Sequence, residues 1–376
     1  MKIFPCSHRP TCPGCARYGE AGIAAAPAGK LEEIVASTGA VLDPVIDGPP
    51  LGFRVRARLA VRGRVSSPKL GIFQEGSHAI VDIPSCTIHH PRINVASRAI
   101  REAMRACDVA PYAERPHTGV LRYVQVVVER ATGRVQIVLC ANDSTPASVL
   151  ALADALGVKL GDRLAGLWWN GNTERTNVIF GPQWKLLAGE ECVRETIGGA
   201  AVFFPPGAFG QSNLDLADRI VADLHARVPD DSVVAELYCG VGAIGLGLVA
   251  RSKAVRFNEA SPQGLAGLER GLAALAPSIR SKAIVVGGDA AHAASILAGA
   301  DTVIVDPPRK GLSPELVQAI RSAEPSRILY LSCDPASLAR DTERLVAGAR
   351  FRLARLTPYA LFPYTDHVET LAHFIP

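Results

Sequence analysis

The second half of the chain alternates short apolar runs with helix-like segments, and this alternation limits the possible folds more than any other feature. The apolar runs are VVAELYC, AVRFNEA, KAIVVGGDA, DTVIVDPP and RILYLSC, and a last run, ETLAHFI, lies close to the end of the chain. Strands and helices in this order are typical of a doubly wound parallel sheet. Such sheets bind ligands outside the carboxyl ends of their strands. The polar residues that end each run are therefore the candidate site residues.

The first half has a different pattern. Short alternating segments broken by Gly and Pro fill residues 51–90, and LRYVQVVVER, RVQIVLC and TNVIFG follow as further strand-like runs. Helices are expected at 31–38 and 93–107. We therefore predict an α+β domain with much antiparallel sheet over residues 1–200, beginning with a Cys-rich module at 1–20. A second, α/β domain would span 201–376, and its first helix, within 211–228, has Asn213 as a suitable cap.

Composition excludes several classes of protein. The 376 residues fit two domains, and 48% hydrophobic with 20% charged residues indicates a globular chain. No apolar run approaches the roughly 18 residues of a membrane span, and the N-terminus has no signal-peptide core, so we expect a cytoplasmic protein without a membrane partner. The net charge of +4 permits an anionic partner. Five arginines without an acid in residues 54–64 predict either a solvated basic strand face or a phosphate-contacting strand.

Three of the strand ends suggest a nucleotide-type cofactor. Gly240 and Gly242 occupy a strand-to-helix turn, where glycine lets the backbone approach a ligand. Glu259 ends the next run and can accept hydrogen bonds from two ribose hydroxyls, while Asp289, at the end of the third, suits the adenine edge. Since there is no GxGxxG motif, S-adenosylmethionine fits this set better than a dinucleotide.

The fourth and fifth runs end in groups that suit chemistry on a base. Asp306 is followed by two prolines, which cannot continue a strand and form a rigid lip that fixes the carboxylate outside the sheet. Cys333 ends the fifth run, where a thiolate could act as a nucleophile. Cys239 lies behind the glycine turn and is interpreted as a packing residue. Near the C-terminus Asp366, His367 and Glu369 are equal candidates, by spacing, for a general base.

The Cys-rich module has the spacing of a metal site. Cys6, Cys12 and Cys15 supply three thiolates, and the compartment argues against disulfides. The fourth ligand could be one of four residues: His8, Cys86, His89 or His90. Zinc and a [4Fe–4S] cluster both accept such a set, and the spacing alone does not choose between them.

Together these segments resemble one family. FGQSN, ELYCGVG, DPPRKG, LSCDPASLARD and FPYTDHVE occur in the order found in the RNA 5-methyluridine methyltransferases. The resemblance implies a Rossmann-like, S-adenosylmethionine-dependent catalytic domain. The first half resembles the iron–sulfur members, with Cys86 as the fourth ligand, which favours a [4Fe–4S] cluster over zinc. The N-terminal β-barrel RNA-binding domain of some members is not expected. We therefore expect a monomer that modifies 23S rRNA, with tRNA as the alternative.

The resemblance also implies roles for single residues. It makes Cys333 the nucleophile and Glu369 the proton acceptor, and it gives cofactor or base binding to Gln211, Tyr238, Glu259, Asp289 and Asp306. Two positions depart from the family pattern. Asp334 stands where the family usually has Asn, and a carboxylate beside a thiol should raise its pKa. The family's Phe-Phe-Gln is Phe209-Gly210-Gln211 here, with one aromatic lost.

Two other functions are compatible with parts of the sequence. Amino-methyltransferases of adenine or cytosine have a similar Asp-Pro-Pro lip, but an aromatic residue usually follows, whereas this chain has Arg309. The second alternative is a non-catalytic iron–sulfur protein that binds RNA or senses redox state. In that case replacing Cys333 would change no reaction.

Overall fold

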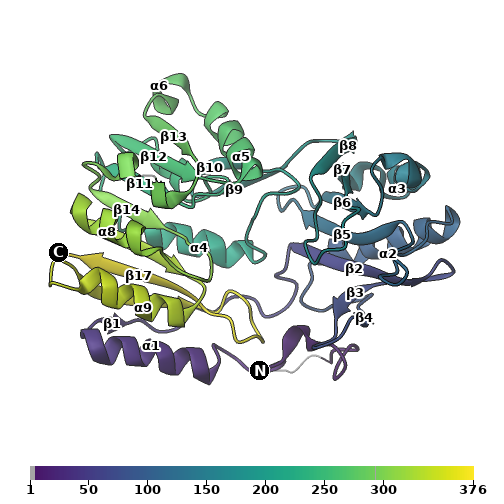
Figure 1. Ribbon diagram of the computed structural model, residues 1–376, viewed down its shortest axis with the longest axis horizontal. Coiled ribbons are helices and arrows are strands. Elements are labelled where there is room, and N and C mark those ends of the chain that lie inside the picture. Colours follow the sequence, from purple (N-terminus) through teal and green to yellow (C-terminus); the bar gives the residue numbers. More distant parts are fainter. Residues whose placement is uncertain (1–4, 293) are drawn as a thin grey trace.

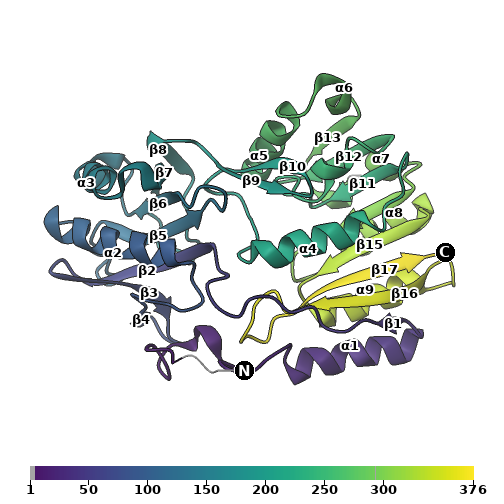
Figure 2. The same cartoon turned by 180° about the vertical axis from the view of Figure 1, so that it is seen from behind.

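The computed structural model describes residues 5–292 and 294–376 and contains two sheets joined by a hairpin (Figure 1). The hairpin consists of β9 (Val193–Ile197) and β10 (Ala200–Phe204), and it lies between the two sheets in both views (Figures 1 and 2). The expected boundary at residue 200 falls at the start of β10 and stays a prediction. Among the described residues, none of the helices has the length and apolarity that a membrane crossing requires.

The first sheet has seven strands in the order β4-β3-β2-β5-β6-β7-β8, and all its pairs are antiparallel except β6–β7. Two helices, α2 (Pro91–Ala106) and α3 (Leu150–Leu160), pack against each other and against this sheet. The strands are β2 (Arg56–Arg64), β3 (Ser67–Phe73), β4 (Ile80–Asp82), β5 (Leu121–Val128), β6 (Val135–Ala141), β7 (Leu164–Gly171) and β8 (Gln183–Gly189).

Two features of this half differ from the sequence prediction. The run TNVIFG (176–181) is not a strand, because its backbone groups form hydrogen bonds with side chains instead of with another strand. The Asn172 Nδ2 donates to the carbonyls of Val178 and Ile179 at 2.8 and 3.0 Å. The Asn170 side chain binds Gly181 in the same way. Helix α3 was not predicted, and it carries the crossover between the parallel strands β6 and β7.

The second sheet has eight strands in the order β1-β16-β17-β15-β14-β11-β12-β13. The five predicted runs form parallel strands, but the last run pairs antiparallel with both of its neighbours. These strands are β11 (Val233–Leu237), β12 (Ala254–Glu259), β13 (Ala283–Gly287), β14 (Thr302–Val305), β15 (Arg327–Ser332), β16 (Arg352–Tyr359) and β17 (Glu369–Ile375). The helices are α4 (Leu214–His225), α5 (Pro262–Ala273), α6 (Pro277–Arg280), α7 (Ala294–Leu297), α8 (Pro314–Ala323) and α9 (Pro335–Val346).

Helices cover both faces of this sheet, as a doubly wound fold requires. Successive strand residues point to opposite faces. In β14, for example, Ile304 packs into the core cluster that contains α4 and α5, whereas Val303 and Val305 pack into the cluster that contains α8 and α9. The predicted cap of the first helix is confirmed, because the Asn213 side chain accepts a hydrogen bond from the Leu216 N–H.

The N-terminal part of the chain contributes to the second sheet. Strand β1 (Val41–Leu42) pairs parallel with β16, and helix α1 (Ala25–Thr38) packs on α9 through Leu31 and Ile34. These residues were expected in the first domain, yet they extend the sheet of the second half.

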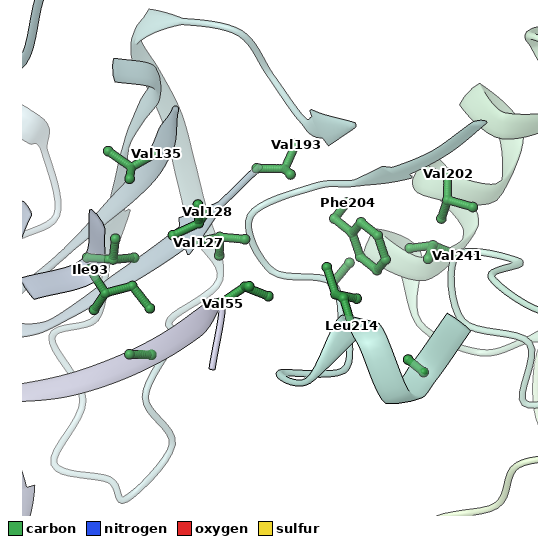
Figure 3. Packing of buried hydrophobic residues seen from close by; sticks show 14 of the residues in the cluster. Val55, Ile93, Val127, Val128, Val135, Val193, Val202, Phe204, Leu214 and Val241 are labelled. Atoms are coloured by element: carbon green, nitrogen blue, oxygen red, sulfur yellow. The ribbon is translucent and has the colours of Figure 1, made fainter. Parts of the chain in front are cut away.

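One continuous apolar cluster joins the two halves (Figure 3). Val55 and Val128 from the first half, Val193 and Phe204 from the hairpin, and Leu214 from α4 are all buried in it. This packing fixes the start of α4, and with it the loop at residues 205–213, against the first sheet.

Candidate active site

The antiparallel last strand brings Cys333 and Glu369 to the same edge of the sheet. Ser332, the last residue of β15, pairs with Thr370, the second residue of β17. Continuing this antiparallel register by one residue sets Cys333 opposite Glu369. Asp306 follows the neighbouring strand β14, so three acidic groups meet where β14, β15 and β17 reach the edge.

Burial separates the three candidates for a general base. Glu369 is only 2% exposed, whereas Asp366 and His367 are exposed. His367 lies beside Arg309, with 3.1 Å between the Arg309 Nη2 and a ring nitrogen. Only Glu369 of the three lies both at the sheet edge and away from bulk water.

Burial raises the pKa of all three acidic groups at this edge, and neighbouring negative charges raise it further at Cys333 and Glu369. Burial, Glu369 and Asp306 raise the pKa of the Cys333 thiol to about 11, and Arg309 acts in the opposite direction. Burial and the Asp306 charge raise the pKa of Glu369 well above its usual value, and burial raises that of Asp306 to about 7. Burial and neighbouring negative charges therefore disfavour proton loss from both Cys333 and Glu369.

Asp334, the departure from the family pattern, caps helix α9. Its Oδ2 accepts a hydrogen bond from the Ser337 N–H at 2.8 Å, at the end of the helix where a negative charge is favourable. The charges that shift the pKa of Cys333 belong mainly to Glu369, Asp306 and Arg309. The carboxylate is therefore committed to the helix rather than to the thiol.

The glycine turn after β11 has the left-handed backbone that its sequence suggests. Tyr238, Gly240 and Gly242 have φ angles of 59°, 56° and 79°. The expected helix after the turn is a short 3-10 helix, Gly245–Leu248. Its backbone is packed very closely, because a Cβ at Gly245 would lie 2.1 Å from the Glu236 Oε2.

Two neighbouring pockets meet at Tyr238. One, with a volume of about 760 Å³, is lined by Tyr238, Glu259 and Asp289. The Glu259 carboxylate accepts hydrogen bonds from the N–H groups of Gly240, Ala260 and Ser261 at 2.7, 2.9 and 2.6 Å, which holds it against the glycine turn. Asp289 is exposed, and its Oδ1 accepts from the Ala291 N–H at 2.9 Å.

The second pocket has a volume of about 680 Å³ and reaches the sheet edge, where Asp306 is part of its wall. Gln211, Tyr238, Gly240 and Phe209 also line it. The structure thus gathers six of the predicted binding residues around two adjacent pockets, with Asp306 on the side that faces Cys333 and Glu369.

Two buried carboxyl groups at this edge were missed by the sequence reasoning. Glu236 in β11 is 1% exposed and lines the second pocket, and burial, followed by Asp306, raises its pKa to about 8. Asp341 in α9 accepts hydrogen bonds from the Leu312 N–H at 2.7 Å and the Tyr330 hydroxyl at 3.0 Å. Glu236 precedes the glycine turn within an apolar run, which is the one sequence signal that distinguishes it. No sequence signal distinguishes Asp341, because a charged residue on a helix usually lies on the solvated face.

The four cysteines of the predicted metal site lie near one another. Burial and the neighbouring thiols Cys86, Cys12 and Cys6 raise the pKa of Cys15 to about 12. All four are free and half-buried. Within residues 5–292 and 294–376, however, no three His, Cys, Asp or Glu side chains form a group with the geometry of a metal site.

Comparisons with known proteins agree with this site. Residues 298–374, which contain Asp306, Cys333 and Glu369, match the family model described as tRNA (Uracil-5-)-methyltransferase. An uncharacterized RNA methyltransferase of Protochlamydia amoebophila is 34% identical over 99% of this chain and 98% of its own length. Another from Gloeobacter violaceus is 34% identical over 88% of this chain and 72% of its own length.

A solved structure has the same fold. The tRNA (uracil-54, C5)-methyltransferase of Pyrococcus abyssi, in complex with S-adenosyl-L-homocysteine, superposes with a TM-score of 0.79 at 24% identity. The match covers 98% of this chain and 86% of that one. Fold and site together define a Rossmann-like methyltransferase. More closely, the chain belongs to the RNA (uracil-5-)-methyltransferase family and is an S-adenosylmethionine-dependent enzyme.

The electrostatics of the ligand-free site predict how Cys333 reacts with iodoacetamide. Because the thiol is mostly protonated below its raised pKa of about 11, its labelling should rise from pH 8 to beyond pH 10. Arg309→Gln removes the charge that lowers this pKa, so labelling at pH 8 should slow roughly two- to tenfold. Peptide mass spectrometry measures the labelling of Cys333 alone. Asp334→Asn is the control and should change little, since Asn caps a helix equally well. Faster labelling of Arg309→Gln would contradict this electrostatic account.

Proposed function

We propose that the protein methylates C5 of a uridine in RNA, with Cys333 as the nucleophile and Glu369 as the base that removes the C5 proton. The observation that supports this most is the register of β15 and β17, which sets the thiol and the buried carboxyl group opposite each other beside Asp306. A thiol and a base on one target ring are what this reaction needs.

The chemistry explains why both groups are required. C5 of uracil is a weak nucleophile, and attack of the Cys333 thiolate on C6 moves the C5=C6 electron pair into an enolate, which makes C5 nucleophilic. S-adenosylmethionine is the substrate that supplies the methyl group. Glu369 then accepts the C5 proton, the C5=C6 bond re-forms, and the sulfur leaves as a thiolate. Asp306 accepts the hydrogen bond of uracil N3–H and orients the ring.

The raised pKa values indicate when the base becomes active. The reaction needs Cys333 to lose its proton to solvent and Glu369 to be a carboxylate, and the raised pKa values make both ionisations unfavourable. Once the sulfur is bonded to C6 it can no longer ionise, so Cys333 adds no negative charge beside Glu369. A carboxylate that forms there stays out of bulk water and is a strong base, because its pKa remains high.

The neighbouring pockets support the proposed binding residues. Glu259, beside the glycine turn of Gly240 and Gly242, would accept the ribose hydroxyls, and Asp289 would face the adenine. Gln211 and Tyr238 would line the path between the methyl donor and the target base, since both line the pocket that Asp306 closes. The uridine must leave its stack to enter this pocket.

The RNA that carries this uridine is proposed to be 23S rRNA, because the Cys-rich module resembles that of the rRNA enzymes. Transfer RNA is the alternative, which the description of the matching family model favours. We also propose that Cys6, Cys12, Cys15 and Cys86 hold a [4Fe–4S] cluster. Four free thiols whose charges act on one another suit a soft metal centre. A cluster would bind the thiolates that burial and mutual repulsion otherwise disfavour.

Covalent trapping tests the nucleophile. RNA that contains 5-fluorouridine should form a denaturation-resistant complex with the wild type, because fluorine cannot leave as the C5 proton does. Cys333→Ser should lose the complex, whereas Cys107→Ser should retain it, since Cys107 lies at the end of α2 on the first sheet. Substituted 23S rRNA and tRNA are compared in parallel, and the one that is trapped is the substrate class. No complex with either RNA would refute the proposal.

Replacement of the base should separate methyl transfer from release. Glu369→Gln keeps the shape of the side chain but cannot accept a proton, so the methylated adduct should accumulate and turnover should fall about 10²–10⁴-fold. Gel mobility of the adduct and release of 5-methyluridine measure the two steps. Asp366→Asn, an exposed carboxylate of the same loop, is the matched control and should turn over normally. Normal turnover of Glu369→Gln would assign the proton to another group.

Metal analysis tests the cluster. Protein purified without oxygen should contain about four iron and four sulfide per chain, and Cys86→Ser should lose most of both. Zinc without sulfide in the wild type would rule the cluster out.

A further inference from the structure

A cavity next to the active site is lined by two arginines of strand β2 and by a third arginine just before that strand. We call it the arginine cavity. The cavity has a volume of about 570 Å³, and its walls are Arg54, Arg56, Arg58, Phe209, Gly210 and Ser212. Phe209 and Gly210 also line the pocket that contains Asp306. The arginine cavity therefore opens directly beside the space proposed for the target base.

These three guanidinium groups have no carboxylate partner among the described residues. Arg130, by contrast, contacts Glu195 and Asp218. Arg122, which is 2% exposed, has no carboxylate partner either, but its guanidinium donates to the carbonyls of Asn172, Glu174 and Thr176. Arg56 is 8% exposed, its Nε has no hydrogen-bond partner, and its Nη1 donates only to the Ala208 carbonyl at 3.2 Å. Burying a cation without a counter-charge is costly. The missing counter-charge is the first indication of an anionic ligand.

Aromatic rings hold the guanidiniums of Arg56 and Arg58 and leave several of their donors available, although the Arg58 Nε donates to the Gln125 Oε1 at 2.7 Å. Arg56 lies over Phe204 and Arg58 over Phe180, with 5.6 and 4.9 Å from the guanidinium carbon to the ring centroid. Stacking on a ring uses the flat face of a guanidinium and leaves its N–H edges free. Because these side chains also line the cavity, a bound anion can reach those edges.

The altered Phe-Phe-Gln position belongs to the same cavity. A Cβ on Gly210 would lie 2.7 Å from the Phe204 Cε1 and 2.9 Å from the Arg56 Nη2. A larger side chain at 210 would therefore displace the Arg56 guanidinium. Glycine at position 210 therefore leaves the room that the buried Arg56 guanidinium occupies.

We propose that this cavity binds a phosphodiester group of the RNA next to the flipped-out uridine. Arginine forks match the oxygens of a phosphate, and a phosphate would supply the counter-charge that Arg56 and Arg58 lack. The proposal rests on the proposed function, since it assigns the position of the RNA backbone relative to the target base. Phosphate contacts position a strand without reading its sequence.

Binding of a labelled ten-nucleotide oligouridylate tests the cavity. Arg56→Gln and Arg58→Gln should each weaken binding about tenfold or more. Each should also reduce the slope of log affinity against log salt by about 0.7, the value for one phosphate contact on a single strand. Arg219→Gln has the same charge change on an exposed residue of α4 that pairs with Asp223, and it should bind as the wild type does. The same oligomer with methylphosphonate linkages should bind all four proteins equally weakly.

Circular dichroism and S-adenosylmethionine binding show whether each variant is folded, and Arg58→Gln decides the test if Arg56→Gln does not fold. If a folded Arg58→Gln variant keeps the wild-type affinity and salt slope, the proposal that the cavity binds a phosphodiester group is wrong. Trapping by 5-fluorouridine RNA distinguishes this failure from failure of the chemistry. If the arginine variants lose affinity while the wild type traps no RNA, the cavity stands and the proposed reaction does not.

Discussion

The position of one antiparallel strand determines the chemistry of this protein. In an all-parallel sheet the residues at the start of a strand lie at the opposite edge from those at the end of its neighbour. Strand β17 runs the other way between β15 and β16, so its first residue, Glu369, reaches the edge where β15 ends at Ser332. The proposed nucleophile from one strand and the proposed base from another thus meet at one edge of the sheet without a long loop to hold either of them.

This arrangement concentrates negative charge. Cys333, Asp306, Glu369 and Glu236 act on one another in a partly dry space, and every one of them has a raised pKa. Ionisation of all four groups together would be strongly unfavourable. Arg309 is the cation that offsets this at the thiol. A ligand that donates hydrogen bonds to Asp306, as a uracil N3–H does, relieves part of the repulsion and thereby couples substrate binding to activation.

Strand ends could be predicted from the sequence, but strand direction could not. The runs that end in Glu259, Asp306 and Cys333 have apolar periodicity followed by a polar break, and a parallel sheet gathers such breaks at one edge. Nothing local in ETLAHFI distinguishes a parallel from an antiparallel strand, so spacing left Glu369 equal to Asp366 and His367. Only their burial separates them. The prediction of a longer helix after Gly242 was also wrong, since only a short 3-10 helix forms there. Gly245 packs against Glu236, and local helix propensity does not reveal such a tertiary contact.

The Cys-rich module acts on the site through packing. Tyr18 contacts Tyr364, with 4.9 Å between the ring centroids, and the Arg17 N–H donates to the Tyr364 carbonyl at 3.0 Å. Tyr364 belongs to the loop that leads to Glu369, and together with Phe53 it forms a small buried cluster against which Cys15 and Cys86 pack.

The residue after Phe53 is Arg54, which lines the arginine cavity. Burial lowers the pKa of Arg54, and the charges of Cys86 and Cys15 act in the opposite direction. The module therefore joins the segment that presents the proposed base to the segment that presents the arginines. Any group that ties the four cysteines together would stiffen both segments at once, because a buried contact such as Tyr18–Tyr364 transmits the constraint with little slack. The distance in sequence between residue 18 and residue 369 explains why this link is invisible without the fold.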